Sequence, residues 1–438
     1  MFHLAWFLGD GYGIHPWNSR RSPWHGTNGR EWTKPDIYID LTCALERAGF
    51  DYLLIEDTTS IDDTYGASME TTLRRGFMAP KNDPIPLVPL LTRASRHIGV
   101  VVTVSTTFYH PYAAARALTT LDHMTEGRVG INIVTSVNHR AAQNFGYDRH
   151  LEHDLRYEMA DEWLDIAGKL WESWADDAVL IDEDADRYVD FTKVHPINYR
   201  GRFYSSRGPL NTIPGPQRRP VIAQAGSSPQ GQALAGKYAD TMLALVSSVD
   251  EMKRFRGNVH AAMLSAGRKP QECKILYLVS PTIAETDADA RELEARRLAA
   301  ASEPEEIERA LWYMSYQSGG EIDYSKLPLD EPMPKATGNG EKSVIEAYLK
   351  AGEMTLRDVA IKRQLGSFAD LVGSPDTVAA KMGEIMEEVG GDGFIISGPV
   401  TRRAITELTD GLAPALRRRG LIRENYPHST FRENLLAF

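Results

Sequence analysis

The segment that decides the fold runs from residue 98 to residue 134 and reads IGVVVTVSTTFYHPYAAARALTTLDHMTEGRVGINIV. It begins with an apolar, β-branched run, Ile98–Val104, which has the length of a buried strand. A helical pattern follows over Ala113–Met124 and ends at Glu126-Gly127-Arg128, after which a second apolar run covers Val129–Val134. A strand, a helix and a strand in this order predict a βαβ unit with two parallel strands.

The same alternation continues in both directions from this segment. The other strand candidates are Phe2–Phe7, Tyr52–Ile55, Val221–Gln224, Thr241–Leu245, Ile275–Ser280 and Gly393–Ile396. Further helical patterns cover Asp36–Ala48, Tyr157–Trp174, Gln230–Tyr238 and Val378–Val389. Eight strands are the number that closes a (β/α)8 TIM barrel, which is the predicted α/β fold. An open doubly wound sheet is the alternative, but no Gly-x-Gly-x-x-Gly follows the first strand to favour it.

Three stretches exceed what a minimal barrel needs. Thr58–Asp83 is polar, Asp176–Pro220 has the composition of an irregular loop or short hairpin, and Ala284–Leu371 is the longest. Long connections in compact domains are usually functional lids or mobile segments. We therefore predict one barrel domain over residues 1–438 with insertions near 58–83, 176–220 and 284–371.

Composition and charge exclude several classes of function. The net charge of −11 argues against nucleic acid or an anionic membrane as a partner. No basic leader precedes the first strand and no apolar run approaches the ~20 residues of a membrane span, so we expect a cytoplasmic protein. The two cysteines, Cys43 and Cys273, cannot form a disulfide framework or a zinc site, and both are predicted to be buried thiols.

In a barrel of this kind the chemistry lies at the carboxyl ends of the strands. This rule selects Asp57, Thr103 and Asn132, and the segment Gln224-Ala225-Gly226-Ser227-Ser228-Pro229. Asp57 is either a ligand contact or a cap of the following loop. The segment at 224–229 leads from a strand into a helix, where glycine and unpaired N–H groups favour a phosphate, although a plain capped turn has the same pattern.

Other candidates are histidines and basic side chains in loops. His153 and Tyr157 share one face if a helix begins at His153, and they suit either phosphate binding or a surface cluster. We expect no metal there, because zinc sites add a further ligand at a recognisable spacing. His15, in the first strand-to-helix loop, is either an acid–base group or an exposed loop histidine. Basic residues that could bind an anionic substrate are Arg74, Arg75, Lys81, Arg140 and Arg149.

Ordered blocks along the whole chain carry a resemblance to a known family. They are Ile131–Ser136, Ala142–Gly146, His150–Asp154 with Arg156-Tyr157, Lys169–Trp171, Val194-His195, Gln224–Gly226 with Ser228-Pro229, Asp392–Phe394, Arg419-Gly420 and Phe431-Arg432. Together they resemble the nitrilotriacetate, dibenzothiophene-sulfone and long-chain-alkane monooxygenase group of the bacterial-luciferase-like flavoproteins. Ordered blocks of this kind are more specific than any single motif.

The resemblance implies a two-component FMN-dependent monooxygenase. Reduced FMN (FMNH2) would come from a separate NAD(P)H:flavin reductase, and O2 would be the co-substrate, activated as a C4a-hydroperoxyflavin to oxygenate a small organic molecule. Relatives are commonly homodimers or homotetramers. By position, the implied FMN contacts are Asp57, Thr103, Asn132, His153, Tyr157 and Ser228. Ser227 adjoins them, where the family usually has an apolar residue.

Two positions depart from the family on the substrate side. Gln317 stands where relatives often have a histidine, and His15 matches the family's first-loop histidine only roughly. These two are the candidate catalytic residues. Three alternatives remain open, namely a lyase or oxygenase whose substrate is itself a flavin, hydride transfer with a deazaflavin, and a non-catalytic flavin-binding protein.

Overall fold

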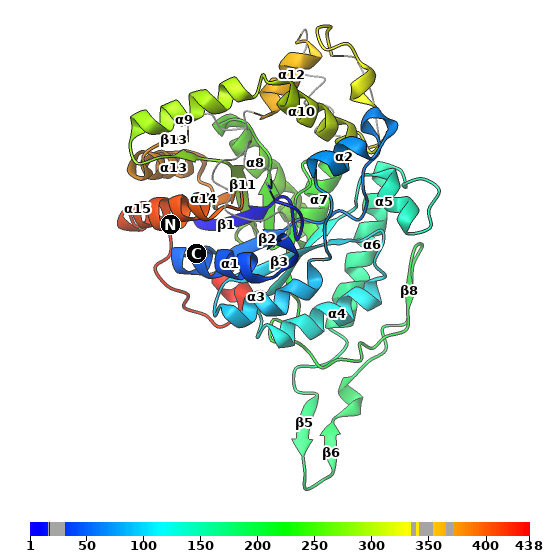
Figure 1. Cartoon of the computed structure of the whole chain (residues 1–438). Coiled ribbons are helices and arrows are strands. Elements are labelled where there is room, and N and C mark those ends of the chain that lie inside the picture. Colours follow the sequence, from blue (N-terminus) through cyan, green and yellow to red (C-terminus); the bar gives the residue numbers. More distant parts are fainter. Residues whose placement is uncertain (16, 18–30, 334–338, 341–353, 365–370) are drawn as a thin grey trace.

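A closed barrel of eight parallel strands forms the centre of the molecule (Figure 1). The computed structural model describes the chain except residues 16, 18–30, 334–338, 341–353 and 365–370. The barrel strands, in spatial order, are β1 (His3–Leu8), β14 (Gly393–Ser397), β11 (Lys274–Val279), β10 (Thr241–Ala244), β9 (Val221–Gln224), β4 (Val129–Val134), β3 (Gly99–Ser105) and β2 (Tyr52–Ile55). The predicted (β/α)8 architecture is confirmed, and the open sheet is wrong.

The strand positions agree with the apolar runs because both faces of each strand are covered. The runs at 52–55, 129–134 and 221–224 match their strands residue for residue. The prediction for β10 is one residue too long. Leu245 leaves the sheet, is half exposed, and lines the cavity described below.

Helices surround the barrel and carry the insertions. Their bounds are α1 (Asp36–Ala48), α2 (Glu70–Arg75), α3 (Val88–Ala94), α4 (Pro111–Met124), α5 (His139–Asn144), α6 (His153–Trp171), α7 (Pro229–Tyr238), α8 (Val249–Ser265), α9 (Asp287–Ala300), α10 (Pro304–Gln317), α12 (Leu356–Gln364), α13 (Pro375–Val389), α14 (Arg402–Thr406), α15 (Ala413–Arg418) and α16 (Phe431–Leu435). Helix α6 begins at His153, as its pairing with Tyr157 requires.

The amino ends of the barrel strands are closed by an aromatic side chain. Phe431 of α16 packs into the barrel interior with Tyr52 and Val101. Glycines make room for it, because a Cβ on Gly99 would lie 2.5 Å from the Phe431 ring and one on Gly130 3.1 Å from it. Because Phe431 fills this end, the carboxyl ends of the strands are where the described residues leave the barrel open to a ligand.

Two insertions pack against each other over those carboxyl ends. The segment 58–83 contains α2, and the segment 284–371 contains α9, α10 and α12. A short parallel pair of strands, β12 (Thr282–Ile283) with β13 (Val372–Gly373), flanks the second segment. The indole of Trp312 in α10 donates to the hydroxyl of Thr72 at 2.7 Å and packs with Phe77 and Met78. The two insertions therefore form a common roof.

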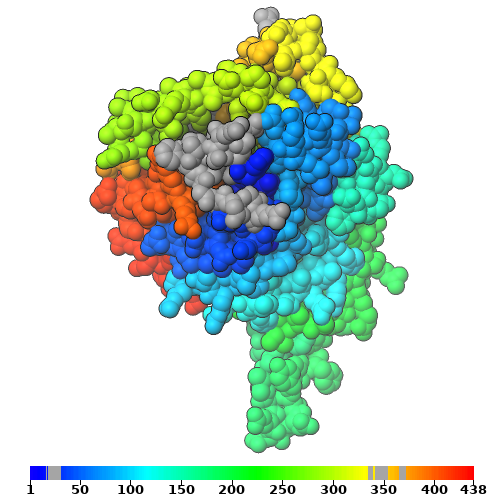
Figure 2. All heavy atoms as spheres, viewed as in Figure 1, coloured from blue at the N-terminus to red at the C-terminus, as the bar shows by residue number. Residues whose placement is uncertain are grey.

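The segment 176–220 forms two antiparallel hairpins. These are β5 (Val179–Asp182) with β6 (Arg187–Val189), and β7 (Tyr199–Arg200) with β8 (Ser205–Ser206). The β5–β6 hairpin projects away from the barrel as an arm (Figures 1 and 2). Its apolar side chains Leu180, Ile181 and Tyr188 are exposed, as is Phe191 just beyond it.

The prediction for the cysteines is correct at one position. Cys273 is buried, whereas Cys43 is only partly covered. Cys43 lies at the edge of α1, between the buried Thr42 and Ala44, and its thiol donates to the carbonyl of Ala94 at 3.4 Å. No helix among the described residues has the length and apolar character needed to cross a bilayer.

Candidate functional site at the mouth of the barrel

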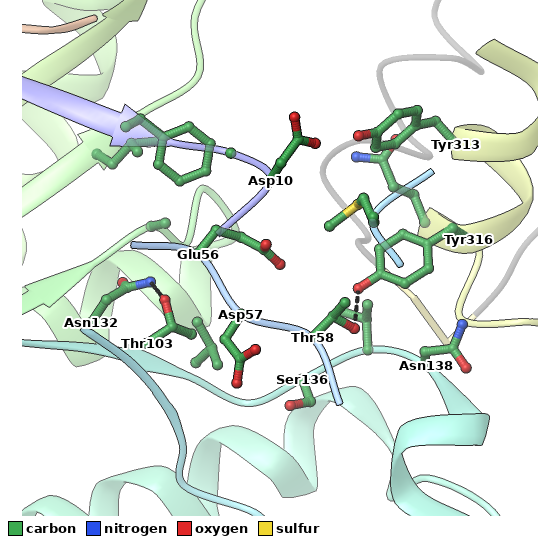
Figure 3. A pocket seen from close by; sticks show the side chains of 18 of the residues that line it. Asp10, Glu56, Asp57, Thr58, Thr103, Asn132, Ser136, Asn138, Tyr313 and Tyr316 are labelled. Atoms are coloured by element: carbon green, nitrogen blue, oxygen red, sulfur yellow. Dashed lines mark hydrogen bonds between the residues drawn. The ribbon is translucent and has the colours of Figure 1, made fainter. Parts of the chain in front are cut away.

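A cavity of about 940 Å³ opens at the carboxyl ends of the strands, beneath the roof. All of the candidate site residues line it, namely His15, Asp57, Thr103, Asn132, His153, Tyr157, Ser227, Ser228 and Gln317. Figure 3 shows Thr103, Asn132 and Asp57 on the barrel side and Tyr313 and Tyr316 of α10 facing them. We call the barrel side the strand wall. The insertion wall consists of the lining residues of α10 and α12 together with residues 75–78.

A short hydrogen-bond relay orders the centre of the strand wall. The hydroxyl of Thr103 donates to the carbonyl of Ile55 at 2.8 Å, and the amide of Asn132 donates to Thr103 at 3.0 Å. This fixes the Asn132 side chain, and its Oδ1 has no hydrogen-bond partner among the described residues although it is buried. A buried acceptor without a donor is costly, so Oδ1 suits a ligand N–H.

The turn after β9 brings two backbone segments into close contact. Ser228 caps α7, because its Oγ accepts from the N–H of Gly231 at 3.1 Å. A Cβ on Gly226 would lie 2.9 Å from the Cα of Gly231 and 3.0 Å from the hydroxyl of Tyr157. The glycine therefore allows the turn, the start of the helix and Tyr157 to meet at one point. The Ser228 hydroxyl proton and the N-terminus of α7 favour an anion there.

A buried cation lies in the first turn of α6, on the same side of the cavity. Arg156 donates to the carbonyls of Ser136 and Asn339, each at 2.8 Å, and its Nε has no partner among the described residues. Burial lowers the pKa of Arg156 to about 10, so it stays charged at neutral pH. Nearby, the rings of His153 and Tyr157 lie 5.0 Å apart. In the described part of the chain, no cluster of three His, Cys, Asp or Glu side chains could hold a metal.

Asp57 is an acid in the cavity whose pKa is strongly raised. Burial, and then the neighbouring Glu56, raise its pKa from 3.8 to about 7. Glu56 is itself paired with Lys81. Asp57 can therefore donate a proton or accept one near neutral pH, which is unusual for an aspartate.

His15 is held in place by a buried tyrosine of α1. Its Nε2 lies 3.0 Å from the hydroxyl of Tyr38, which can donate in turn to the carbonyls of Gly13 and Trp32. This arrangement suits Nε2–H as the donor to Tyr38. On the other side of the ring, Nδ1 lies 4.0 Å from Oδ2 of Asp10. His15 is buried and lines the cavity, so the exposed-loop interpretation is wrong.

The insertion wall is aromatic and basic. The hydroxyl of Tyr316 donates to Thr58 at 3.1 Å, and its ring stacks on that of Trp312. Oε1 of Gln317 accepts from the guanidinium of Arg363 in α12 at 2.8 Å. The same guanidinium lies over the ring of Tyr313, 5.0 Å from its centroid.

Most of the basic residues expected to bind an anionic substrate lie outside the cavity. Among them only Arg75 lines the cavity, and it already pairs with Glu308. Lys81 is next to the cavity through its partner Glu56, which lines it. The others pair on the surface, Arg74 with Glu308, Arg140 with Asp63 and Arg149 with Glu321. Arg140 and Arg149 border a separate shallow recess.

Three further cations that line the cavity were not selected from the sequence as anion-binding candidates. They are Arg156, Arg309 and Arg363. For Arg309 a signal existed, since Arg309, Tyr313 and Gln317 recur at spacings of four on one face of α10. For Arg363 no local signal existed, because its place depends on the packing of α12 against α10.

Comparison with known proteins agrees with this architecture. A family model described as luciferase-like monooxygenase matches residues 18–393. The dimethyl-sulfide monooxygenase of Hyphomicrobium sulfonivorans is 36% identical over 92% of this chain and 84% of its own. Nitrilotriacetate monooxygenase component A of Aminobacter aminovorans is 33% identical over 92% of this chain and 90% of its own. A riboflavin lyase solved with modified FMN and riboflavin has a TM-score of 0.89 at 27% identity, covering 100% of this chain and 96% of its own. The chain therefore belongs to the luciferase-like monooxygenase family.

Proposed function

We propose that this chain is the oxygenating component of a two-component, FMNH2-dependent monooxygenase that acts on a small organic substrate. A separate NAD(P)H:flavin reductase would supply the reduced flavin. One relative is named as component A of a monooxygenase, and one similar structure holds a modified FMN. The observation that carries the proposal is the strand wall, which offers polar partners for a flavin ring and its phosphate within one cavity.

The strand wall fits FMN in two respects. The buried Oδ1 of Asn132 requires a donor, and a flavin ring carries N–H groups. At the phosphate end, Arg156 has no carboxylate within ion-pair distance among the described residues, so its charge remains for an anion. Ser228 and the start of α7 add donors of the kind that bind phosphate.

Bound reduced flavin supplies the electrons with which one atom of O2 enters the substrate while the other becomes water. The protein must keep bulk water out of the cavity and orient the substrate. Apolar side chains at the strand ends, Phe7, Leu243 and Leu278, contribute to the first task. His15 is placed to hold or move a proton at Nδ1 on the substrate side, and Gln317 positions Arg363.

The test is substrate-dependent oxygen uptake in the presence of a flavin reductase, NADH and FMN. A panel of organosulfur compounds, alkanes, amino-polycarboxylates and riboflavin is screened, with product detected by mass spectrometry after incorporation of ¹⁸O from ¹⁸O2. We expect at least one compound to gain a labelled oxygen. The proposal would be contradicted if the protein bound FMN but no compound of the panel gained a labelled oxygen.

A flavin as the substrate is the second candidate, and the size of the cavity favours it. At about 940 Å³ the cavity lies near the upper limit for small-molecule sites, so it has room beyond one isoalloxazine ring. Tyr313 and Tyr316 offer aromatic faces on the opposite side. Riboflavin in the panel distinguishes this candidate, because it would then be the compound that is consumed.

The pKa of Asp57 predicts a pH-dependent affinity for reduced FMN. Because this pKa is raised to about 7, the carboxyl is neutral below that pH and negative above it. The Kd of wild type for the anionic reduced flavin should therefore rise as the pH increases through 7, by at most about tenfold per pH unit for one linked proton. Anaerobic titrations of wild type and Asp57→Asn, one unit either side of pH 7, measure the ratio of their Kd values. Equal pH profiles would contradict the prediction.

We also propose that the chain forms a homodimer or homotetramer through the β5–β6 arm. A two-stranded hairpin is marginally stable alone in water, and exposed apolar patches mark interaction sites. The arm stands clear of the rest of the molecule and exposes Ile181, Tyr188 and Phe191 (Figure 2). Light scattering on the triple serine variant at these positions should give a smaller mass than wild type, and an unchanged mass would exclude the arm as the interface.

A further inference from the structure

Two guanidinium groups meet on the insertion wall at a single aromatic side chain. Arg309 of α10 and Arg363 of α12 both line the cavity, and both act electrostatically on the Tyr313 hydroxyl between them. The carbon at the centre of the Arg363 guanidinium lies 5.0 Å from the centroid of the Tyr313 ring, and that of Arg309 lies 5.8 Å from the centroid of the Phe77 ring. The positive charge is therefore held against apolar surface.

Neither guanidinium is fully neutralised by its neighbours. In the described part of the chain no carboxylate lies within ion-pair distance of Arg363, which donates to the neutral Oε1 of Gln317 and has a buried Nε without a partner. Among the described residues, Arg309 has only Glu306 within ion-pair distance, at 3.9 Å, and Asp10 acts on it from farther away. By contrast, Arg75, which lines the same cavity, and Lys81, whose partner Glu56 lines it, are closely paired. A buried donor without a partner and two incompletely paired cations at one position favour an anion there.

We propose that Arg363 and Arg309 bind the carboxylate or sulfonate group of an amphiphilic organic substrate, whose apolar body lies along Phe77 and Met78. This inference names the substrate class for the proposed function and rests on it. The Tyr313 hydroxyl adds a neutral donor between the two arginines. Gln317 is a positioning residue here, because it orients the Arg363 guanidinium and leaves the other N–H groups of that guanidinium for the anion.

The charges on the opposite side of the cavity give this binding a direction. Asp10, Glu56 and Asp57 lie across from Tyr313, on the loops that follow β1 and β2 (Figure 3). Asp10, together with Asp57 once it is ionised above about pH 7, repels an anionic group from that side, and the insertion wall attracts it. The uncharged end of the substrate is therefore the part presented to the strand wall, where the flavin is proposed to bind.

Calorimetric titration of the FMN-loaded protein tests the inference without turnover. The probes are hexanoate, 3-phenylpropanoate, succinate and hexanesulfonate, each beside its neutral amide. We expect at least one acid to bind more tightly than its amide. In Arg363→Gln the affinity for that acid should fall about tenfold to hundredfold, the effect of one charged hydrogen-bonding partner, while the affinity for the amide stays unchanged. Arg363→Lys should recover part of the loss.

Control variants show whether a loss of acid binding is specific to the arginines of the insertion wall. Arg149→Gln removes one exposed arginine outside the cavity and should leave acid binding unchanged. Arg309→Gln is the second variant, which keeps the test decisive if Arg363→Gln does not fold. Equal affinity of every acid and its amide in wild type would overturn the inference, as would an equal loss for acid and amide in the variants.

The same titrations distinguish failure of this inference from failure of the proposed function. FMN affinity is measured first in each protein, and the acids are titrated with and without FMN. If wild type does not bind FMN, the proposed function fails, whereas a preference for acids that depends on Arg363 still supports the anion site. If Arg363→Gln weakens FMN as much as it weakens the acid, these arginines hold the flavin phosphate and the inference is overturned.

Discussion

Replacing His15 with alanine is expected to lower product formation about a hundredfold, within the range that a positioned acid or base contributes. Oxygen should still be consumed and appear as H2O2, because the strand wall proposed to hold the flavin is unchanged. The physical reason is the placement of the imidazole in the cavity lining, with Nε2 held by Tyr38 at 3.0 Å and Nδ1 4.0 Å from Oδ2 of Asp10. The measurement is the ratio of product to oxygen consumed, with the substrate that the oxygen-uptake screen identifies.

Two further variants give this prediction its controls. Tyr38→Phe keeps the histidine but removes the hydroxyl that orients it, so an intermediate loss of coupling is expected. His139→Ala removes a histidine that pairs with Glu321 outside the cavity and should leave coupling unchanged. A wild-type ratio of product to oxygen in His15→Ala would remove His15 from the chemistry.

Adding one methyl group at Gly226 should weaken FMN binding by about 2 kcal/mol, or roughly thirtyfold in Kd, the usual scale of overpacking. The Cβ would lie 2.3 Å from Nε2 of Gln224 and 2.9 Å from the Cα of Gly231. The glutamine can rotate away, but the Gly231 backbone belongs to the first turn of α7. The turn must therefore separate from the helix, which displaces Ser228 and the N–H groups proposed to bind the phosphate.

Fluorescence titration with FMN measures this effect, and a second glycine supplies the control. A Cβ on Gly257, inside α8, would meet no atom within 4 Å, so Gly257→Ala should bind FMN like wild type. Thermal unfolding of both variants shows whether the loss is local to the site. Unchanged FMN affinity in Gly226→Ala would mean that the phosphate is bound elsewhere.

The fold was largely predictable because each buried parallel strand appears in the sequence as a continuous apolar run. Helix starts were less predictable. The helix predicted from Val378 begins at Pro375, since its first turn faces solvent and carries no apolar periodicity. The N-cap Ser374 and the proline at the first helical position were the available signals. Helix α6 likewise begins before its apolar face does, at His153.

The sequence predicted the residues of the strand wall better than those of the insertion wall. Asp57, Thr103, Asn132 and Ser228 could be selected because barrel geometry alone places strand ends at one mouth. Arg363 could not be selected, because α12 reaches the cavity only through its packing against α10. Loop arginines gave a misleading signal, since a charge in a loop is often already paired, as Arg140 is with Asp63.

The roof over the barrel mouth consists of helices inserted between strands, whereas the strand wall is part of the barrel itself. Selection for a new compound can thus act on α10 and α12 while the barrel core and the flavin contacts proposed for it are inherited intact. A mutagenesis library confined to Arg309, Tyr313, Tyr316 and Arg363 would explore new specificities at little risk to folding. Divergence within the family can proceed by the same route, with one part of the protein conserved and the other free to vary.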